Sequence, residues 1–104
     1  MGNMADLKNL QKEAYQNKLK KGFNTTDVNL EFALTYQELA EAFRAYRQKL
    51  PELGEELADV MIYLLGLSEI LGIDLESEVL KKMEKNKKRQ YQKVSGVNIR
   101  VENE

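Results

Sequence analysis

The sequence predicts an all-α protein, a four-helix bundle with short connections. Apolar residues recur three or four positions apart over long segments, which is the periodicity of core-facing helices. Gly22, Pro51 and Gly72 divide these segments at the places where helices stop and start. The 104 residues suit one domain, residues 1–104, in which residues 94–104 form an extended tail.

The first two helices are predicted on either side of a short loop. The first runs from about Met4 to Lys21, and Gly22 is a typical residue after a helix end. The second runs to about Gln48, and its first turn is capped by Thr26 or Asp27, since either side-chain oxygen can accept from a free backbone N–H.

The third and fourth helices are predicted from their boundary residues. The third begins at Pro51, where the missing N–H costs nothing, and ends at Gly72. The fourth is capped by Asp74 and reaches about Tyr91, with basic residues in its last turns where they suit the helix dipole. In the tail after it, polar and apolar residues alternate, so the tail can form either a short strand or an extended arm.

Composition excludes several classes of site. Sixteen basic and 17 acidic residues give a net charge of −1, so no global field attracts nucleic acid or anionic membranes. Cysteine and histidine are both absent, which excludes thiolate nucleophiles, histidine bases and metal sites built on sulfur or imidazole. A metal must be held by oxygen, which favours Mg²⁺, Mn²⁺ or Ca²⁺.

The N-terminus does not resemble a signal peptide, and the longest uncharged run, residues 60–68, is far shorter than the roughly 20 residues that cross a bilayer. We therefore expect a cytoplasmic protein that does not enter membranes.

Two pairs of acids lie in line with the apolar residues on one face of the second and third predicted helices. Glu38 and Glu41 form one pair and Glu56 and Asp59 the other, and three-residue spacing places both carboxylates of a pair on one helix face. Antiparallel packing would bring the pairs together, and a divalent cation would offset the cost of burying like charges. The alternative is that the acids are solvated or complement the helix dipoles.

The segments YQELAEAFRAYR, EELADVMIYLLGL and KMEKNKKRQY are similar to those of the MazG-like, all-α nucleoside triphosphate pyrophosphohydrolases, which are related to dimeric dUTPases. The family pattern is Glu-Glu-x-x-Glu, a spacer, then Glu-x-x-Asp. Gln37 takes the place of the leading glutamate in the register that we prefer, because AFRAYR then falls where the family's helix continues. A register three residues away can also be drawn, and it leaves the leading acids unmatched.

The resemblance implies hydrolysis of a (d)NTP to the monophosphate and pyrophosphate. House-cleaning of non-standard nucleotides is one role that it suggests. It implies Mg²⁺, or Mn²⁺, held by Glu38, Glu41, Glu56 and Asp59. Glu38 and Glu41 are the candidates for the general base, which takes the proton of the attacking water.

The resemblance also suggests residues that contact the nucleotide; these are Asn17, Lys18, Phe23, Tyr63, Lys82, Asn86 and Arg89. Asn86 is expected on the inward face of the fourth helix. Structural alternatives remain: Tyr63 can be a core tyrosine, Phe23 can plug the bundle, and the lysines can form a solvated helix face.

Two other classes of function remain open. One is a helical module that binds nucleotide or protein after losing catalysis, which Gln37 and the small size suggest. The other, a nucleic-acid binder using the basic fourth helix, is disfavoured because no aromatic stacking platform accompanies the charges. We expect a homodimer or homotetramer, because the helices carry more apolar surface than one chain covers and the family is oligomeric.

Overall fold

The computed structural model describes residues 6–101. Its elements follow the chain in the order α1 (Leu7–Lys21), α2 (Val28–Arg47), α3 (Leu53–Ile70), α4 (Leu75–Lys88), β1 (Gln90–Val94) and β2 (Val97–Val101). The four predicted helices and the all-α class are confirmed. Residues 4–5, predicted as the start of the first helix, and residues 102–104 of the tail lie outside the described range. Within that range, no helix is long and apolar enough to cross a membrane.

Aspartates set the beginnings of three helices. Asp6, Asp27 and Asp74 each accept a hydrogen bond from the backbone N–H three residues later, at 2.7, 3.0 and 3.2 Å. Asp27 rather than Thr26 is therefore the cap of α2. Gly22 follows α1 in the left-handed conformation, with φ 70°, which glycine adopts without steric cost.

Four predicted boundaries differ from the structure by two or three residues. The first helix begins at Leu7, where Met4 was predicted, and the third ends at Ile70, where Gly72 was predicted. Pro51 lies in the turn before α3, which begins at Leu53. The fourth helix ends at Lys88, short of the predicted Tyr91, because the chain enters β1 at Gln90.

The predicted tail supplies β2 of a β-hairpin, so the strand is the alternative that the structure confirms, while β1 comes mainly from the residues before the tail. β1 and β2 are antiparallel, with Gln90 opposite Val101 and Val94 opposite Val97. Ser95 and Gly96 make the turn, and both have positive φ, 51° and 79°. This is the geometry of a tight two-residue hairpin turn, whose twist matches that of the strands.

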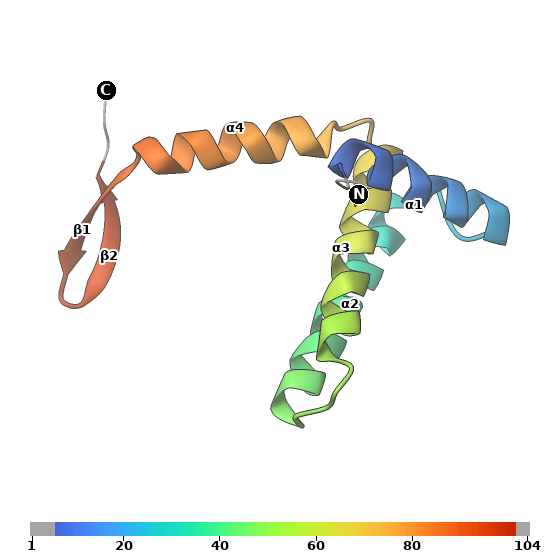
Figure 1. Ribbon diagram of the computed structural model, residues 1–104, viewed down its shortest axis with the longest axis horizontal. Coiled ribbons are helices and arrows are strands. Elements are labelled where there is room, and N and C mark those ends of the chain that lie inside the picture. The colour runs from blue at the N-terminus through green and yellow to red at the C-terminus, as the bar shows by residue number, and fades with distance from the viewer. Residues whose placement is uncertain (1–5, 102–104) are drawn as a thin grey trace, which may run out of the picture.

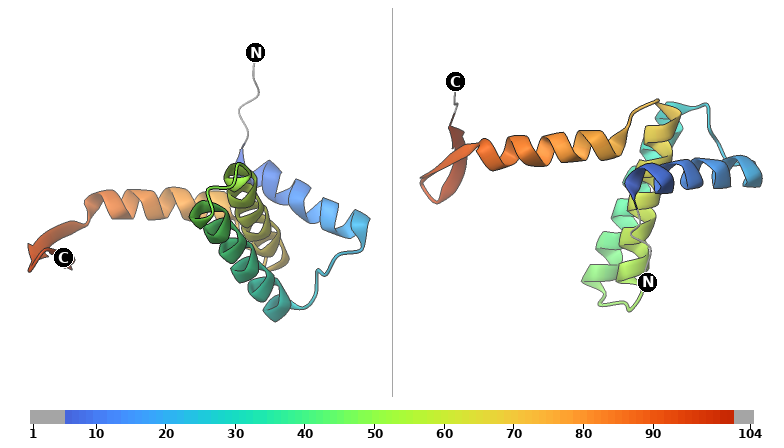
Figure 2. Two further views of the ribbon diagram at one scale, coloured as in Figure 1. Left: turned by 90° about the horizontal axis from the view of Figure 1, so that it is seen from below. Right: turned by 45° about the horizontal axis from the view of Figure 1, so that its top comes forward.

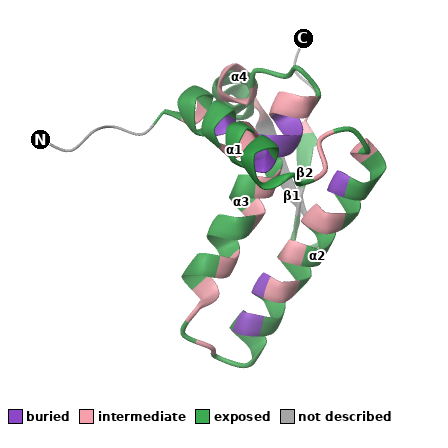
Figure 3. Cartoon of the chain, turned by 90° about the vertical axis from the view of Figure 1, so that its right-hand side faces the viewer, coloured by how far each residue is buried: buried purple, intermediate pink, exposed green. Residues whose placement is uncertain are grey.

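The core is formed by α3, which packs against α2 and against α1. α2 and α3 lie side by side and antiparallel, and α1 crosses α3 near its C-terminal half (Figures 1 and 2). Fully buried apolar side chains are few in the described range; they are Ala42, Ala45, Leu65 and Leu67. Figure 3 shows the buried residues along one face of α2 and at the crossing of α1 and α3.

α4 starts at the core and then leaves it. Gln11 of α1 anchors this start, because its side-chain amide donates to the Ile73 carbonyl at 2.6 Å and its oxygen accepts from the Leu75 N–H at 3.3 Å. Beyond that point α4 projects away from α2 and α3 and carries the hairpin at its far end (Figure 1). None of the α4 residues is buried.

One face of α2 is apolar and exposed along its whole length. Phe32, Tyr36, Leu39, Phe43 and Tyr46 follow one another at steps of four and three residues, and each is between 45% and 73% exposed. This spacing places them in one row, here called the α2 stripe, which has the pattern of a helix–helix seam. Large exposed apolar patches of this kind mark interaction sites.

Candidate functional site

Three predicted acids meet between α2 and α3. Glu38 comes from α2, and Glu56 and Asp59 come from successive turns of α3. One carboxylate oxygen of each lies within 4.8 Å of the others. Antiparallel packing of the two helices therefore brings together acids that are about 20 residues apart in the chain.

Glu41 lies beside this group without belonging to it. Its carboxylate accepts a long hydrogen bond of 3.4 Å from the Gln37 amide, and its charge acts on both Glu38 and Glu56. The grouping agrees with the register in which Glu38 is the last acid of the α2 motif. Thr35 then occupies the position one turn earlier, where its hydroxyl donates to the Glu31 carbonyl at 2.8 Å. The assignment of Glu41 as a ligand stays a prediction.

Burial and the charges of neighbouring acids raise the pKa of two carboxyls at this site, Glu38 and Glu56. Burial, followed by Glu41, Asp59 and Glu56, raises the pKa of Glu38 above its ordinary value. Burial, followed by Glu41, Asp59 and Glu52, raises the pKa of Glu56, and Arg44 partly opposes this. The three carboxylates offer only oxygen ligands and repel one another. Such a group fits a hard divalent cation, whose charge would remove the repulsion.

These shifts predict an unusual dependence of stability on pH. A carboxyl with a raised pKa binds more protons in the folded than in the unfolded state, so stability falls as pH rises through that window. The window begins at the ordinary carboxyl value of 4.5 and extends upward. We expect Glu38→Gln to reduce this fall in metal-free protein, as measured by urea midpoints from pH 4.5 to 8. Parallel curves for the two proteins would contradict the prediction.

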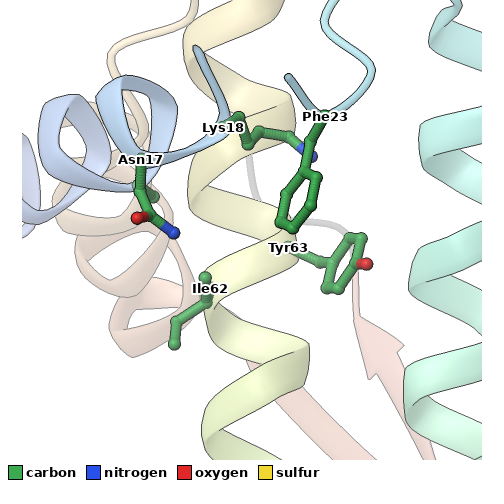
Figure 4. Close-up of a pocket in the computed structure, with 6 residues that line it drawn as sticks. Asn17, Lys18, Phe23, Ile62 and Tyr63 are labelled. Atoms are coloured by element: carbon green, nitrogen blue, oxygen red, sulfur yellow. The ribbon is translucent and has the colours of Figure 1, made fainter. Parts of the chain in front are cut away.

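A small pocket adjoins the acidic group. Its lining residues come from α1, the following loop and α3; they are Ala14, Asn17, Lys18, Phe23, Ile62 and Tyr63. Four of them, Asn17, Lys18, Phe23 and Tyr63, are predicted nucleotide contacts, and Figure 4 shows them around one space. Phe23 is 55% exposed, so it lines the pocket and does not plug the bundle.

Tyr63 connects the pocket with the acids. It lies one turn after Asp59 on α3, and its ring is half-buried. Burial comes first among the causes that raise the pKa of Tyr63, followed by the charges of Glu38, Glu31 and Asp59. The phenol therefore stays protonated and can donate a hydrogen bond beside the carboxylates.

Lys18 is buried and already paired. Its ammonium lies 2.7 Å from a carboxylate oxygen of Glu31 and 5.2 Å from the centre of the Tyr63 ring. Its charge is thus neutralised by the protein, while its carbon chain lines the pocket. Sequence reasoning missed Glu31, although it lies seven residues before Glu38 and so shares the core-facing side of α2.

The predicted contacts on α4 lie elsewhere in the chain. Lys82 and Asn86 belong to α4, which projects away from α2 and α3, and Arg89 directly follows it, so a single chain does not bring them to the acids (Figure 1). The predicted inward face of α4 is open: Asn86 is exposed, and its side-chain oxygen accepts from Arg89 at 3.0 Å. Arg89, followed by burial, Lys85 and Arg100, lowers the pKa of Lys82. A basic group therefore forms at the end of α4.

Comparison with known families places this geometry in context. The family model described as MazG-like family matches residues 29–102, which include α2 from its second residue, α3, α4 and the acidic group. Neither the curated proteins nor the solved structures gave a match to the chain. The match covers well over half of the 104 residues. This agrees with the helical order and the acidic motif described above, and the chain belongs to the MazG-like family.

Proposed function

We propose that the protein is a Mg²⁺-dependent nucleoside triphosphate pyrophosphohydrolase, which cleaves a (d)NTP to the monophosphate and pyrophosphate. The observation that supports this most directly is the arrangement of the acids and the pocket. A three-carboxylate group lies next to a pocket with two aromatic residues, and Tyr63 is common to both regions. Such a site can hold the phosphates and the base of one nucleotide at once.

The acids supply the metal-dependent part of the chemistry. Glu38, Glu56 and Asp59 would hold the cation, with Mn²⁺ as an alternative to Mg²⁺, and the bound ion would neutralise the triphosphate and lower the pKa of a water. Glu41 lies outside this group and close to it, so it is the better placed of the two candidate general bases.

The pocket supplies the contacts to the base. Phe23 and Tyr63 offer aromatic faces for stacking, and Asn17 offers both a donor and an acceptor at the rim. A planar heterocycle is the ligand that such a combination fits.

We further propose that the enzyme works as a homo-oligomer, a dimer or a tetramer. The α2 stripe supplies an apolar seam for a second copy. Within one chain, α4 points away from the acids, so its basic residues do not reach them. The α4 helix of a second copy would supply Lys82, Asn86 and Arg89 as contacts for the negatively charged phosphates.

A module that binds nucleotide without cleaving it is the second candidate. In the register that ends at Glu38, Leu34 and Thr35 stand where the family has acids, and the structure groups one acid of α2, not two, with the pair from α3. Fewer carboxylates hold fewer metal ions, which would weaken catalysis more than binding.

A panel of (d)NTPs tests the proposal. We expect pyrophosphate release from at least one nucleotide in the presence of Mg²⁺ or Mn²⁺, and none in excess chelator. Calorimetric binding without turnover would support the binding module. Absence of release from every nucleotide would overturn the enzyme.

A further inference from the structure

A buried carboxylate lies behind the pocket, and none of the proposed chemistry uses it. Glu31 is 1% exposed, and among the described residues it is the largest side chain that is fully buried. Burying a charged group destabilises a protein unless partners compensate for it. Its partners therefore indicate what the residue does.

Two segments that carry pocket residues are bound to Glu31. One carboxylate oxygen has the Lys18 ammonium, at 2.7 Å, as its partner and no other in the described range. The other accepts a hydrogen bond from the Asn24 amide at 3.0 Å. Lys18 belongs to α1, and Asn24 directly follows Phe23 in the loop. Glu31 thus connects α2 to both segments.

Asn24 in turn holds its loop in shape. Its amide also donates to the Asp27 carbonyl at 2.9 Å, and its side-chain oxygen accepts from the Asp27 N–H at 3.0 Å. The loop therefore cannot shift relative to α2 without breaking contacts with Glu31. Phe23, whose own side chain is 55% exposed, depends on this neighbour for its position.

The path of Lys18 is equally restricted. A Cβ atom added to Gly66 of α3 would lie 3.2 and 3.3 Å from Cδ and Cε of Lys18, so glycine leaves room for the lysine to pass. Beyond Gly66 the ammonium lies over the Tyr63 ring, 5.2 Å from its centre. The ion pair therefore fixes a pocket wall and one face of Tyr63 together.

We propose that Glu31 is a positioning residue for the base-binding pocket, acting through Lys18 and Asn24 on Phe23 and Tyr63. The proposal rests on the proposed function, in that the pocket is taken to bind the base of the nucleotide. Glu31 itself touches neither substrate nor metal. Its loss should weaken recognition of the base and spare the contacts of the acids with phosphate.

The test compares two ligands, a (d)NTP that the wild type cleaves and inorganic tripolyphosphate, which has no base. We expect Glu31→Gln to raise KM for the nucleotide roughly tenfold with a small change in kcat, because the pocket wall moves and the acids do not. The affinity for tripolyphosphate with Mg²⁺, from calorimetry, should stay unchanged. The matched control is Glu84→Gln, which breaks the exposed ion pair with Lys87. It should change neither KM for the nucleotide nor the affinity for tripolyphosphate.

A second measurement is independent of activity. In the ligand-free wild type, NMR should show nuclear Overhauser effects between the rings of Phe23 and Tyr63, and Glu31→Gln should weaken them. If no nucleotide binds to the wild type, the proposed function fails and this measurement alone decides the role of Glu31. Unchanged ring contacts and an unchanged KM would overturn the positioning role.

Two further variants test the proposal in case Glu31→Gln does not fold. Lys18→Met combined with Glu31→Gln removes both buried charges at similar volume, so it should fold better than either single variant while the pocket stays displaced. Gly66→Ala keeps both charges and pushes on Lys18, and it should also raise KM for the nucleotide and leave tripolyphosphate binding unchanged. Equal weakening of both ligands in these folded variants would overturn the proposal.

Discussion

Asp59→Asn and Glu56→Gln are each expected to lower pyrophosphohydrolase activity by at least about 100-fold, and to weaken Mg²⁺ binding by a similar factor. Changes to residues that only support metal ligands already cost 10- to 100-fold, and these two would be ligands. Either substitution leaves two of the three carboxylates in the group. Steady-state kinetics and calorimetric titration with Mg²⁺ measure the two effects.

The neighbouring acid provides the control for this experiment. Glu55 precedes Glu56 in the first turn of α3 and is exposed, and it lies outside the acidic group. We expect Glu55→Gln to keep near-normal activity. Metal-free Glu56→Gln should also resist urea better than metal-free wild type, because one repelling charge is gone. Full activity in Asp59→Asn would refute the role of the acidic group.

Tyr36→Glu together with Phe43→Glu is expected to convert the proposed oligomer to monomers at micromolar concentration. Both residues belong to the middle of the α2 stripe, where they are 73% and 59% exposed in the single chain. Aromatic residues at the centre of an interface each contribute about 2 kcal/mol or more, which is roughly 30-fold in Kd. Burying a carboxylate there adds a further penalty. Light scattering across a concentration series measures the change.

Activity in this variant shows whether the oligomer completes the site. If α4 of a second copy supplies basic residues, the monomer should keep its Mg²⁺ affinity and lose turnover, and Lys82→Met should reproduce the loss without dissociation. Leu19→Glu, an exposed apolar position on α1, is the control for surface charge and should leave the oligomer intact. A wild-type protein that is monomeric at micromolar concentration would exclude this arrangement.

Local features of the sequence were sufficient to predict the helices and part of the candidate site. Caps such as Asp27 and stops such as Gly22 act within one turn, so they can be read without tertiary structure. The α3 pair was predicted for the same reason, since three-residue spacing fixes which side chains share a face. The pocket residues of α1 and its loop were predicted from the family resemblance.

Other features could not be predicted from the sequence, because they depend on the packing of segments that are distant in the chain. The helices, the all-α class and the carboxylates of α2 and α3 could be predicted from the sequence, because they depend on local spacing and capping. The packing of α1, α2 and α3 was needed to show that Glu38 joins Glu56 and Asp59, that Lys18 is neutralised by Glu31, and that α4 leaves the core. Crossing angles and the paths of long side chains past small residues such as Gly66 settle these contacts, and no local pattern specifies them.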